Sequence, residues 1–184
     1  AGSRPLPKER AHLHFEIALR LSDDFQSWYN WRDFGSKNDH GAWNGMNLVG
    51  VDPKAFYDAF REKRVDSFMD FWRTKPVAVT LRIATISTPD FIKRYPGLRE
   101  GPIPLFNLAG WEVDFDEFGV PLQWRPLLAE SVAGYKRNEV RIVSTDEALL
   151  DGVNCKDLVK SSRGQEVPDS DLKTNLQLLF GLRG

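Results

Sequence analysis

A strict two-residue alternation near the start of the chain constrains the fold more than any other feature. Residues 12–21 read H-L-H-F-E-I-A-L-R-L. In an extended strand, successive side chains point to opposite faces. The apolar positions share one face: Leu13, Phe15, Ile17, Leu19 and Leu21. The other positions share the second face: His12, His14, Glu16, Ala18 and Arg20. We therefore predict a strand with its apolar face in the core and two imidazoles and a carboxylate on its polar face.

The balance of charge limits the possible partners. The chain has 25 Lys plus Arg against 26 Asp plus Glu, a formal net charge of -1, so it has no positive excess that would attract nucleic acid or an anionic membrane. Its apolar runs are interrupted long before the roughly 18 residues that a membrane span needs. Cys155 is the only cysteine, which excludes an intrachain disulfide and a four-cysteine zinc site. We expect neither a nucleic-acid partner nor a membrane-spanning segment.

The remainder of the first 75 residues combines aromatic side chains with turn formers. The pattern predicts a short helix or turn over 22–34 and a long loop over 35–50, which is rich in Gly, Asn and Asp. A helix should begin at Asp52-Pro53, with Asp as the N-cap and Pro as the first helical residue. A second short helix should follow it. The aromatic residues at helical spacing in these two helices are predicted to pack in the core: Phe56, Phe60, Phe68 and Trp72.

The second part of the chain is predicted to begin after a boundary at Lys75-Pro76. The expected elements are a strand over 77–86, a short helix over 87–95, a hairpin over 111–124, a strand over 139–144, a helical turn over 145–150 and a helix over 171–182. Carboxylates near the hairpin turn, Asp114, Asp116 and Glu117, are interpreted as solvated. The fold class is therefore α+β, with one region over 1–75 and an α+β extension of unknown role over 76–184.

The three histidines, His12, His14 and His40, all fall within the first 40 residues. Side chains two positions apart on one strand face lie roughly 6–7 Å apart, so His12 and His14 can both reach one small site. Neutral imidazole is a common zinc ligand, and zinc-bound water is acidic enough to act as a nucleophile near neutral pH. Two surface histidines on a half-exposed strand would give the same pattern.

The string HLHFEI at residues 12–17 resembles the signature of lysostaphin-type (LytM-like) zinc endopeptidases, which hydrolyse peptide cross-links of bacterial peptidoglycan. In that family a strand with the pattern H-L-H-F-E carries two functional histidines. The string VDPKAF at residues 51–56 is similar to the end of the family's peptidase domain. The resemblance covers roughly residues 10–60. It implies that residues 1–75 are the β-rich C-terminal part of a LytM-like peptidase domain.

Carried over to this sequence, the resemblance makes His14 a zinc ligand and His12 the catalytic histidine, with one zinc ion in the intact enzyme. The family's other two ligands, a His and an Asp, would precede His12, and residues 1–11 contain neither. We therefore expect a fragment that is inactive alone, whose sheet an upstream fragment or a second chain completes. The implied substrate is a peptidoglycan peptide, and the implied location is the periplasm or the cell exterior.

Three further residues are candidates for a substrate groove: Trp31, His40 and Trp43. Aromatic rings in or near loops can stack on sugars or shape a peptide groove, and core packing is the alternative for the tryptophans. His40, with Asp39 beside it, could also replace a missing zinc ligand.

Two other functions remain open. One is a catalytically degenerate domain that binds cell-wall glycopeptide or a protein partner. The other is a small non-enzymatic α+β domain in which the HLHFE string is a coincidence.

Overall fold

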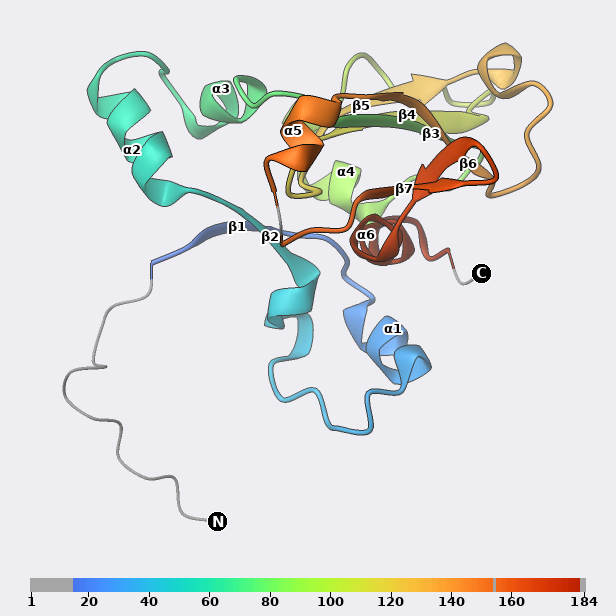
Figure 1. Cartoon of the computed structure of the whole chain (residues 1–184), viewed down its shortest axis with the longest axis horizontal. Coiled ribbons are helices and arrows are strands. Elements are labelled where there is room, and N and C mark those ends of the chain that lie inside the picture. Colours follow the sequence, from blue (N-terminus) through green and yellow to red (C-terminus); the bar gives the residue numbers. More distant parts are fainter. Residues whose placement is uncertain (1–14, 154, 183–184) are drawn as a thin grey trace.

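The computed structural model describes residues 15–153 and 155–182 (Figure 1). The described part is a mixed α+β structure with six helices and several small antiparallel sheets, the largest of four strands. This confirms the predicted α+β class. The two histidines of the HLHFE string, His12 and His14, lie outside the described residues. None of the described helices has the length and apolar character needed to cross a membrane.

The helices are α1 (Phe25–Arg32), α2 (Pro53–Arg61), α3 (Phe68–Arg73), α4 (Asp90–Arg94), α5 (Glu147–Asp151) and α6 (Ser170–Phe180). The strands are β1 (Ile17–Arg20), β2 (Leu48–Val51), β3 (Val79–Ile83), β4 (Gly110–Phe115), β5 (Pro121–Leu127), β6 (Val140–Thr145), β7 (Val159–Ser162) and β8 (Gln165–Pro168). Short 3-10 turns are η2 (Gly41–Trp43), η3 (Gly45–Asn47), η4 (Pro96–Leu98) and η5 (Ala129–Val132).

A two-stranded antiparallel ribbon joins β1 to β2, with Ile17 opposite Val51 and Arg20 opposite Leu48. The predicted strand is confirmed over residues 17–20. The prediction of a loop through residue 50 is wrong at its end, because pairing with β1 turns the short Leu48–Val51 segment into a strand. The prediction that Phe15 faces the core is also wrong, since this side chain is 67% exposed.

The larger sheet has the strand order β5-β4-β3-β6 and is antiparallel throughout. Side chains alternate across it as the pleat requires. Leu81, Val113 and Trp124 are fully buried on one face. Helices α4 and α6 cover that face, because the ring of Trp124 lies 5.6 Å from Phe91 and 5.4 Å from Phe180 between centroids. The core of the molecule lies in this layer.

The described residues before residue 76 pack directly against this layer. The indole N–H of Trp72 on α3 donates to the carbonyl of Pro121 at 3.3 Å, and that of Trp28 on α1 donates to Gln177 on α6 at 3.1 Å. Trp72 is fully buried, as predicted, whereas Phe60 is 52% exposed and the core prediction for it is wrong. The division of the chain at residue 75 stays a prediction.

The β7–β8 hairpin has no counterpart among the predicted elements. Its two-residue turn, Arg163-Gly164, has positive φ at both positions, the geometry that matches the twist of two paired strands. The hairpin lies beside β6, where the hydroxyl of Thr145 donates to Glu166.

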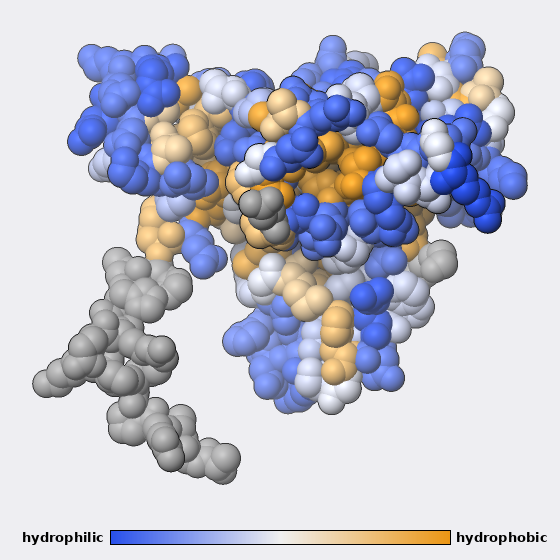
Figure 2. Space-filling view, viewed as in Figure 1, coloured by the Kyte–Doolittle hydropathy of each residue, from blue (hydrophilic) through white to orange (hydrophobic). Residues whose placement is uncertain are grey.

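On the face of the molecule drawn in Figure 2, hydrophilic side chains cover most of the periphery, and hydrophobic side chains are visible near α4 and α5.

Candidate functional site at the β1–β2 ribbon

The described part of the HLHFE string is its downstream end, which leads into β1. Phe15 and Glu16 are exposed and precede the strand directly. The predicted zinc ligand His14 and the predicted catalytic His12 lie outside the described residues, so their positions stay predictions. The three candidate groove residues are all described and exposed: Trp31 in α1, His40 before η2, and Trp43 at the end of η2.

The loop that carries His40 and Trp43 is held by asparagine side chains. Asn38 donates to Gln26 on α1 at 2.9 Å and to the carbonyl of Gly41 at 3.0 Å. Asn47 is fully buried and donates to the carbonyls of Ser22 and Ala42, both at 2.8 Å. Because a buried amide needs such partners, Asn47 fastens this loop to the segment that follows β1. The sequence predicted only a long loop over residues 35–50.

Trp43 lies over the polar face of β1. The guanidinium carbon of Arg20 is 5.2 Å from the centroid of its indole ring, within the range of a cation–π interaction. By strand alternation Arg20 shares a face with Glu16, the same face to which the sequence pattern assigns His12 and His14. His40 belongs to the same turn, since its carbonyl accepts from the Trp43 amide at 3.1 Å. The structure therefore brings Trp43 to the side of the ribbon predicted to be functional and places His40 in the adjoining turn.

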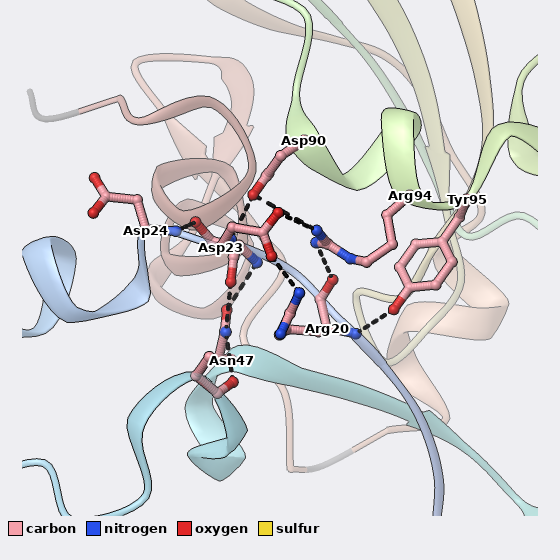
Figure 3. A network of polar contacts seen from close by, with 9 residues as sticks. Arg20, Asp23, Asp24, Asn47, Asp90, Arg94 and Tyr95 are labelled. Carbon is pink, nitrogen blue, oxygen red and sulfur yellow. Dashed lines mark hydrogen bonds and ion pairs between the residues drawn. The ribbon is translucent and has the colours of Figure 1, made fainter.

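A polar network ties the end of β1 to α4 (Figure 3). Arg94 pairs with Asp23 at 2.6 Å and donates to the carbonyl of Arg20 at 3.0 Å. The backbone amide of Arg20 donates to the Tyr95 hydroxyl at 3.0 Å. The guanidinium of Arg20 also pairs with Asp23, whose backbone amide donates to Asp90. The charges of Arg20, Asp23, Asp90 and Arg94 are all paired within the network, so its evident role is to position the strand.

A second charged cluster lies on the face of the large sheet opposite the core. Arg125 donates to both carboxylate oxygens of Asp114, at 2.8 and 2.7 Å, and to Glu112 at 2.7 Å. Arg82 adds a bond to Glu112, and Thr80 adds one to Asp114. The hydrogen bonds to Asp114 raise the pKa of Arg125. Burial opposes ionisation of Glu112, but the two arginines outweigh it and lower its pKa.

The interpretation of the hairpin carboxylates as solvated is wrong for Asp114 and Asp116, which are 6% and 1% exposed. One oxygen of Asp116 accepts from the amides of Phe118 at 3.0 Å and Val120 at 2.8 Å. Burial raises the pKa of this carboxyl to about 6. The turn is covered by α6, where Asn175 donates to the carbonyl of Gly119 at 2.8 Å. Asp116 therefore closes the turn from inside, in a place that only the tertiary fold creates.

The described residues do not complete a zinc site. Over 15–153 and 155–182, no three His, Cys, Asp or Glu side chains lie close enough together to hold a metal ion. Asp39, considered as a substitute ligand beside His40, pairs with Lys37 at 3.5 Å. We therefore assign no catalytic step to the described residues. The ligand that the resemblance implies, His14, lies upstream of them.

Known proteins offer no relative with which this site can be compared. No protein-family model, curated protein or solved structure matches the chain. The likeness of residues 12–17 and 51–56 to lysostaphin-type endopeptidases therefore stays a hypothesis. It rests on those two strings, and the β1–β2 ribbon joins the described ends of both.

Proposed function

We propose that this chain is the C-terminal part of a zinc-dependent metalloendopeptidase that hydrolyses peptide cross-links of bacterial peptidoglycan. The observation that carries the proposal is that the HLHFEI string leads directly into a β-strand of the structure. That strand, β1, pairs with β2, and β2 runs into the VDPKAF string at residues 51–56. In this proposal residues 1–75 form the β-rich end of a LytM-like domain, and 76–184 form an α+β extension that supports the motif strand through α4.

The resemblance gives each candidate residue a role in this proposal. His14 is one of three protein ligands to zinc, and His12 donates or accepts a proton during hydrolysis. A zinc ion held there would supply an activated water near neutral pH. Trp31, His40 and Trp43 border the substrate groove. The remaining ligands come from an upstream segment or a second chain, so the chain alone is inactive, and its place of action is the periplasm or the cell exterior.

Zinc titration of the chain, followed by NMR of its histidine side chains, tests this proposal. The sequence has only three histidines, so their imidazole signals can be assigned from His12→Ala, His14→Ala and His40→Ala variants. We expect zinc to shift the signals of His12 and His14 together and to leave that of His40 unchanged. His14→Ala should weaken zinc binding at least tenfold, since the loss of even an outer-shell partner of a metal ligand typically costs about 10- to 100-fold in affinity. Because the chain holds only one of the three proposed ligands, zinc binds it weakly and is added in excess. A His14 signal that zinc does not shift, or a measurable zinc affinity that His14→Ala leaves unchanged, would overturn the proposal.

A second candidate function is a non-catalytic domain that binds cell-wall glycopeptide. The observation that favours it is Trp43, a large aromatic side chain that is 68% exposed and stacked on Arg20, a surface suited to a sugar ring or a peptide. Co-sedimentation with purified peptidoglycan sacculi separates the two functions. Binding that Trp43→Ala reduces, but that His14→Ala and zinc chelation leave unchanged, would favour the non-catalytic domain. Phe106→Ala is a matched control, because Phe106 is 94% exposed and belongs to a different loop.

A further inference from the structure

A groove of about 320 Å³ runs along the outer edge of β2. Three consecutive residues of this strand line it, Leu48, Val49 and Gly50, and no described residue of β1 does. Successive side chains of a strand point to opposite faces, so a cavity bordered by three residues in a row lies beside the strand and not over one of its faces. The groove is therefore on the side of β2 that faces away from β1.

The register of the ribbon fixes which backbone groups of β2 point toward this groove. The amide of Leu21 donates to the carbonyl of Asn47 at 2.8 Å. In an antiparallel pair of strands, residue pairs that exchange such bonds alternate with pairs that do not. In the observed register, Val49 is therefore bonded to β1, whereas Leu48 and Gly50 direct their amides and carbonyls away from β1.

Most of these outward backbone groups are unpaired. The amide of Leu48 donates to the carbonyl of Gly45 in the preceding turn. The carbonyl of Leu48 and both backbone groups of Gly50 have no hydrogen bond to any other element within residues 15–153 and 155–182. An edge of this kind is a template for pairing with another strand.

The opposite edge of the ribbon differs, because its end is covered. There the amide of Arg20 donates to the hydroxyl of Tyr95, and the carbonyl of Arg20 accepts from Arg94. On the β2 edge, Gly50 is exposed, and a glycine within a strand often marks a place where another backbone approaches closely. The open edge and the glycine thus point to the same kind of ligand, an extended chain.

The far wall of the groove limits what can enter it. This wall is formed by Phe118 in the β4–β5 turn and by Thr174 and Asn175 on α6. The turn and the helix are joined, since Asn175 donates to the carbonyl of Gly119 at 2.8 Å. The volume is at the low end of the range for ligand pockets, which suits one short extended segment. The β2 edge of a second copy would bring its own α6 and turn into the same space.

We propose that this groove binds an extended peptide segment of another protein, which adds to the ribbon as a third strand beside β2. Backbone hydrogen bonds to Leu48 and Gly50 hold the segment, and its alternate side chains set the preference. Val49 is 7% exposed, so peptide side chains on its face enter apolar surroundings. Those on the opposite face, the face of Gly50, meet solvent. The expected partner segment therefore alternates apolar and polar residues.

This inference goes beyond the proposed function and does not rest on it, because neither zinc nor hydrolysis enters. Its test uses the whole chain and the peptide N-acetyl-Thr-Val-Thr-Val-Thr-amide, followed by NMR of the backbone amides. We expect a saturable shift of the Gly50 amide signal and about tenfold slower hydrogen exchange at this amide when the peptide is bound. The amide of Val49, which is already bonded to β1, should change little.

Two N-methylated forms of the peptide test the backbone pairing. One carries methyl groups on the amides of its threonines and the other on those of its valines, so the side chains are kept. Because alternate amides of a strand point to the same edge, one form should bind about tenfold more weakly and the other should bind like the parent peptide. Equal affinity of all three peptides would overturn the proposal.

Variants of the groove complete the test. Thr174→Trp fills the groove from α6, and Gly50→Pro removes the outward amide; each should weaken peptide binding about tenfold. Lys173→Trp places the same bulky side chain at an exposed neighbour outside the lining and should leave binding unchanged. Unaltered amide signals of β3 and β4 would show that the variants remain folded.

Three results would overturn the proposal. The first is the absence of a saturable shift at Gly50. The second is peptide binding that both Thr174→Trp and Gly50→Pro leave unchanged. The third is concentration-dependent dimerisation of the chain that Gly50→Pro abolishes, because the edge would then be occupied by a second copy.

Discussion

The β1–β2 ribbon and the large sheet are both antiparallel, but different parts of the molecule stabilise them. In the sheet, the inner face is fully buried at Leu81 and Val113, and the outer face is cross-linked by Arg125. In the ribbon, every residue of β1 is only half-buried, and Arg94 reaches it from α4. The outer face of the sheet is therefore held together by contacts among its own strands, whereas the strand next to the candidate site is held by a contact from a helix outside the ribbon.

The largest expected effect in this comparison comes from Arg125→Gln in the sheet. This substitution leaves Asp114 buried without its bidentate partner and removes one of two partners of Glu112. Breaking a buried pair costs about 3–5 kcal/mol, and we expect the free energy of unfolding in urea to fall by about that amount.

Arg82→Gln is the matched control for this prediction. Arg82 is 35% exposed and contacts Glu112 alone in this cluster, so its removal should cost about 1 kcal/mol or less. If the two variants lose the same free energy of unfolding, the buried ion pair with Asp114 contributes no more to stability than an exposed one. The prediction that this pair stabilises the sheet would then be wrong.

A smaller, pH-dependent effect is expected at Asp116. Its pKa is about 6 in the folded chain against an ordinary value of 3.8, because burial disfavours the charged form. The hydrogen bonds from the Val120 and Phe118 amides lower this pKa only in part; the charge of Glu117 raises it further and that of Lys75 lowers it. The folded chain therefore binds more protons than the unfolded chain between these two values. Its stability falls as the pH rises through this window, by up to about 3 kcal/mol, and then stays level.

Asp116→Asn tests this pH dependence. Asparagine keeps the acceptor for the amides of Phe118 and Val120 but carries no charge. Relative to the original chain, the variant should gain free energy of unfolding as the pH is raised from 4 to 7.5, and urea unfolding at several pH values measures this difference. A difference between the two proteins that does not change with pH would show that Asp116 is not held in its protonated form.

Local signals predicted the elements whose cause lies within a few neighbouring residues. The helix after Asp52 is confirmed in detail, since the Asp52 side chain accepts from the amides of Lys54 and Ala55. Two missed elements needed other information. The β2 strand is four residues long, includes Gly50, and exists through its pairing with β1. The turn at Arg163-Gly164 is not one of the Asn-Gly or Asp-Gly pairs typical of such hairpins, and its flanking strands lack a clear alternation of apolar and polar residues.

The candidate site was less accessible to sequence reasoning than the fold. Exposed aromatic residues in loops were identified, but the contact of Trp43 with Arg20 depends on how the loop folds back. The network at Arg94 joins residues more than 70 positions apart, and no local pattern encodes such a pairing. The burial of Asp116 likewise arises because α6 covers a turn that would otherwise face water.

The smallest expected effect addresses the ribbon itself. Arg94→Gln removes the ion pair with Asp23 and the bond to the carbonyl of Arg20. These contacts are partly exposed and confined to the end of β1. We therefore expect the loss of about 1–2 kcal/mol of stabilisation to appear as easier opening of β1, with little change in the free energy of global unfolding. Hydrogen exchange should accelerate about 5- to 30-fold at the amides of β1 and stay unchanged at β3 and β4. Arg61→Gln, which removes an exposed ion pair on α2, should change neither. Equal acceleration in the ribbon and the large sheet would mean that both open together, and the strand of the candidate site would then need no support of its own from α4.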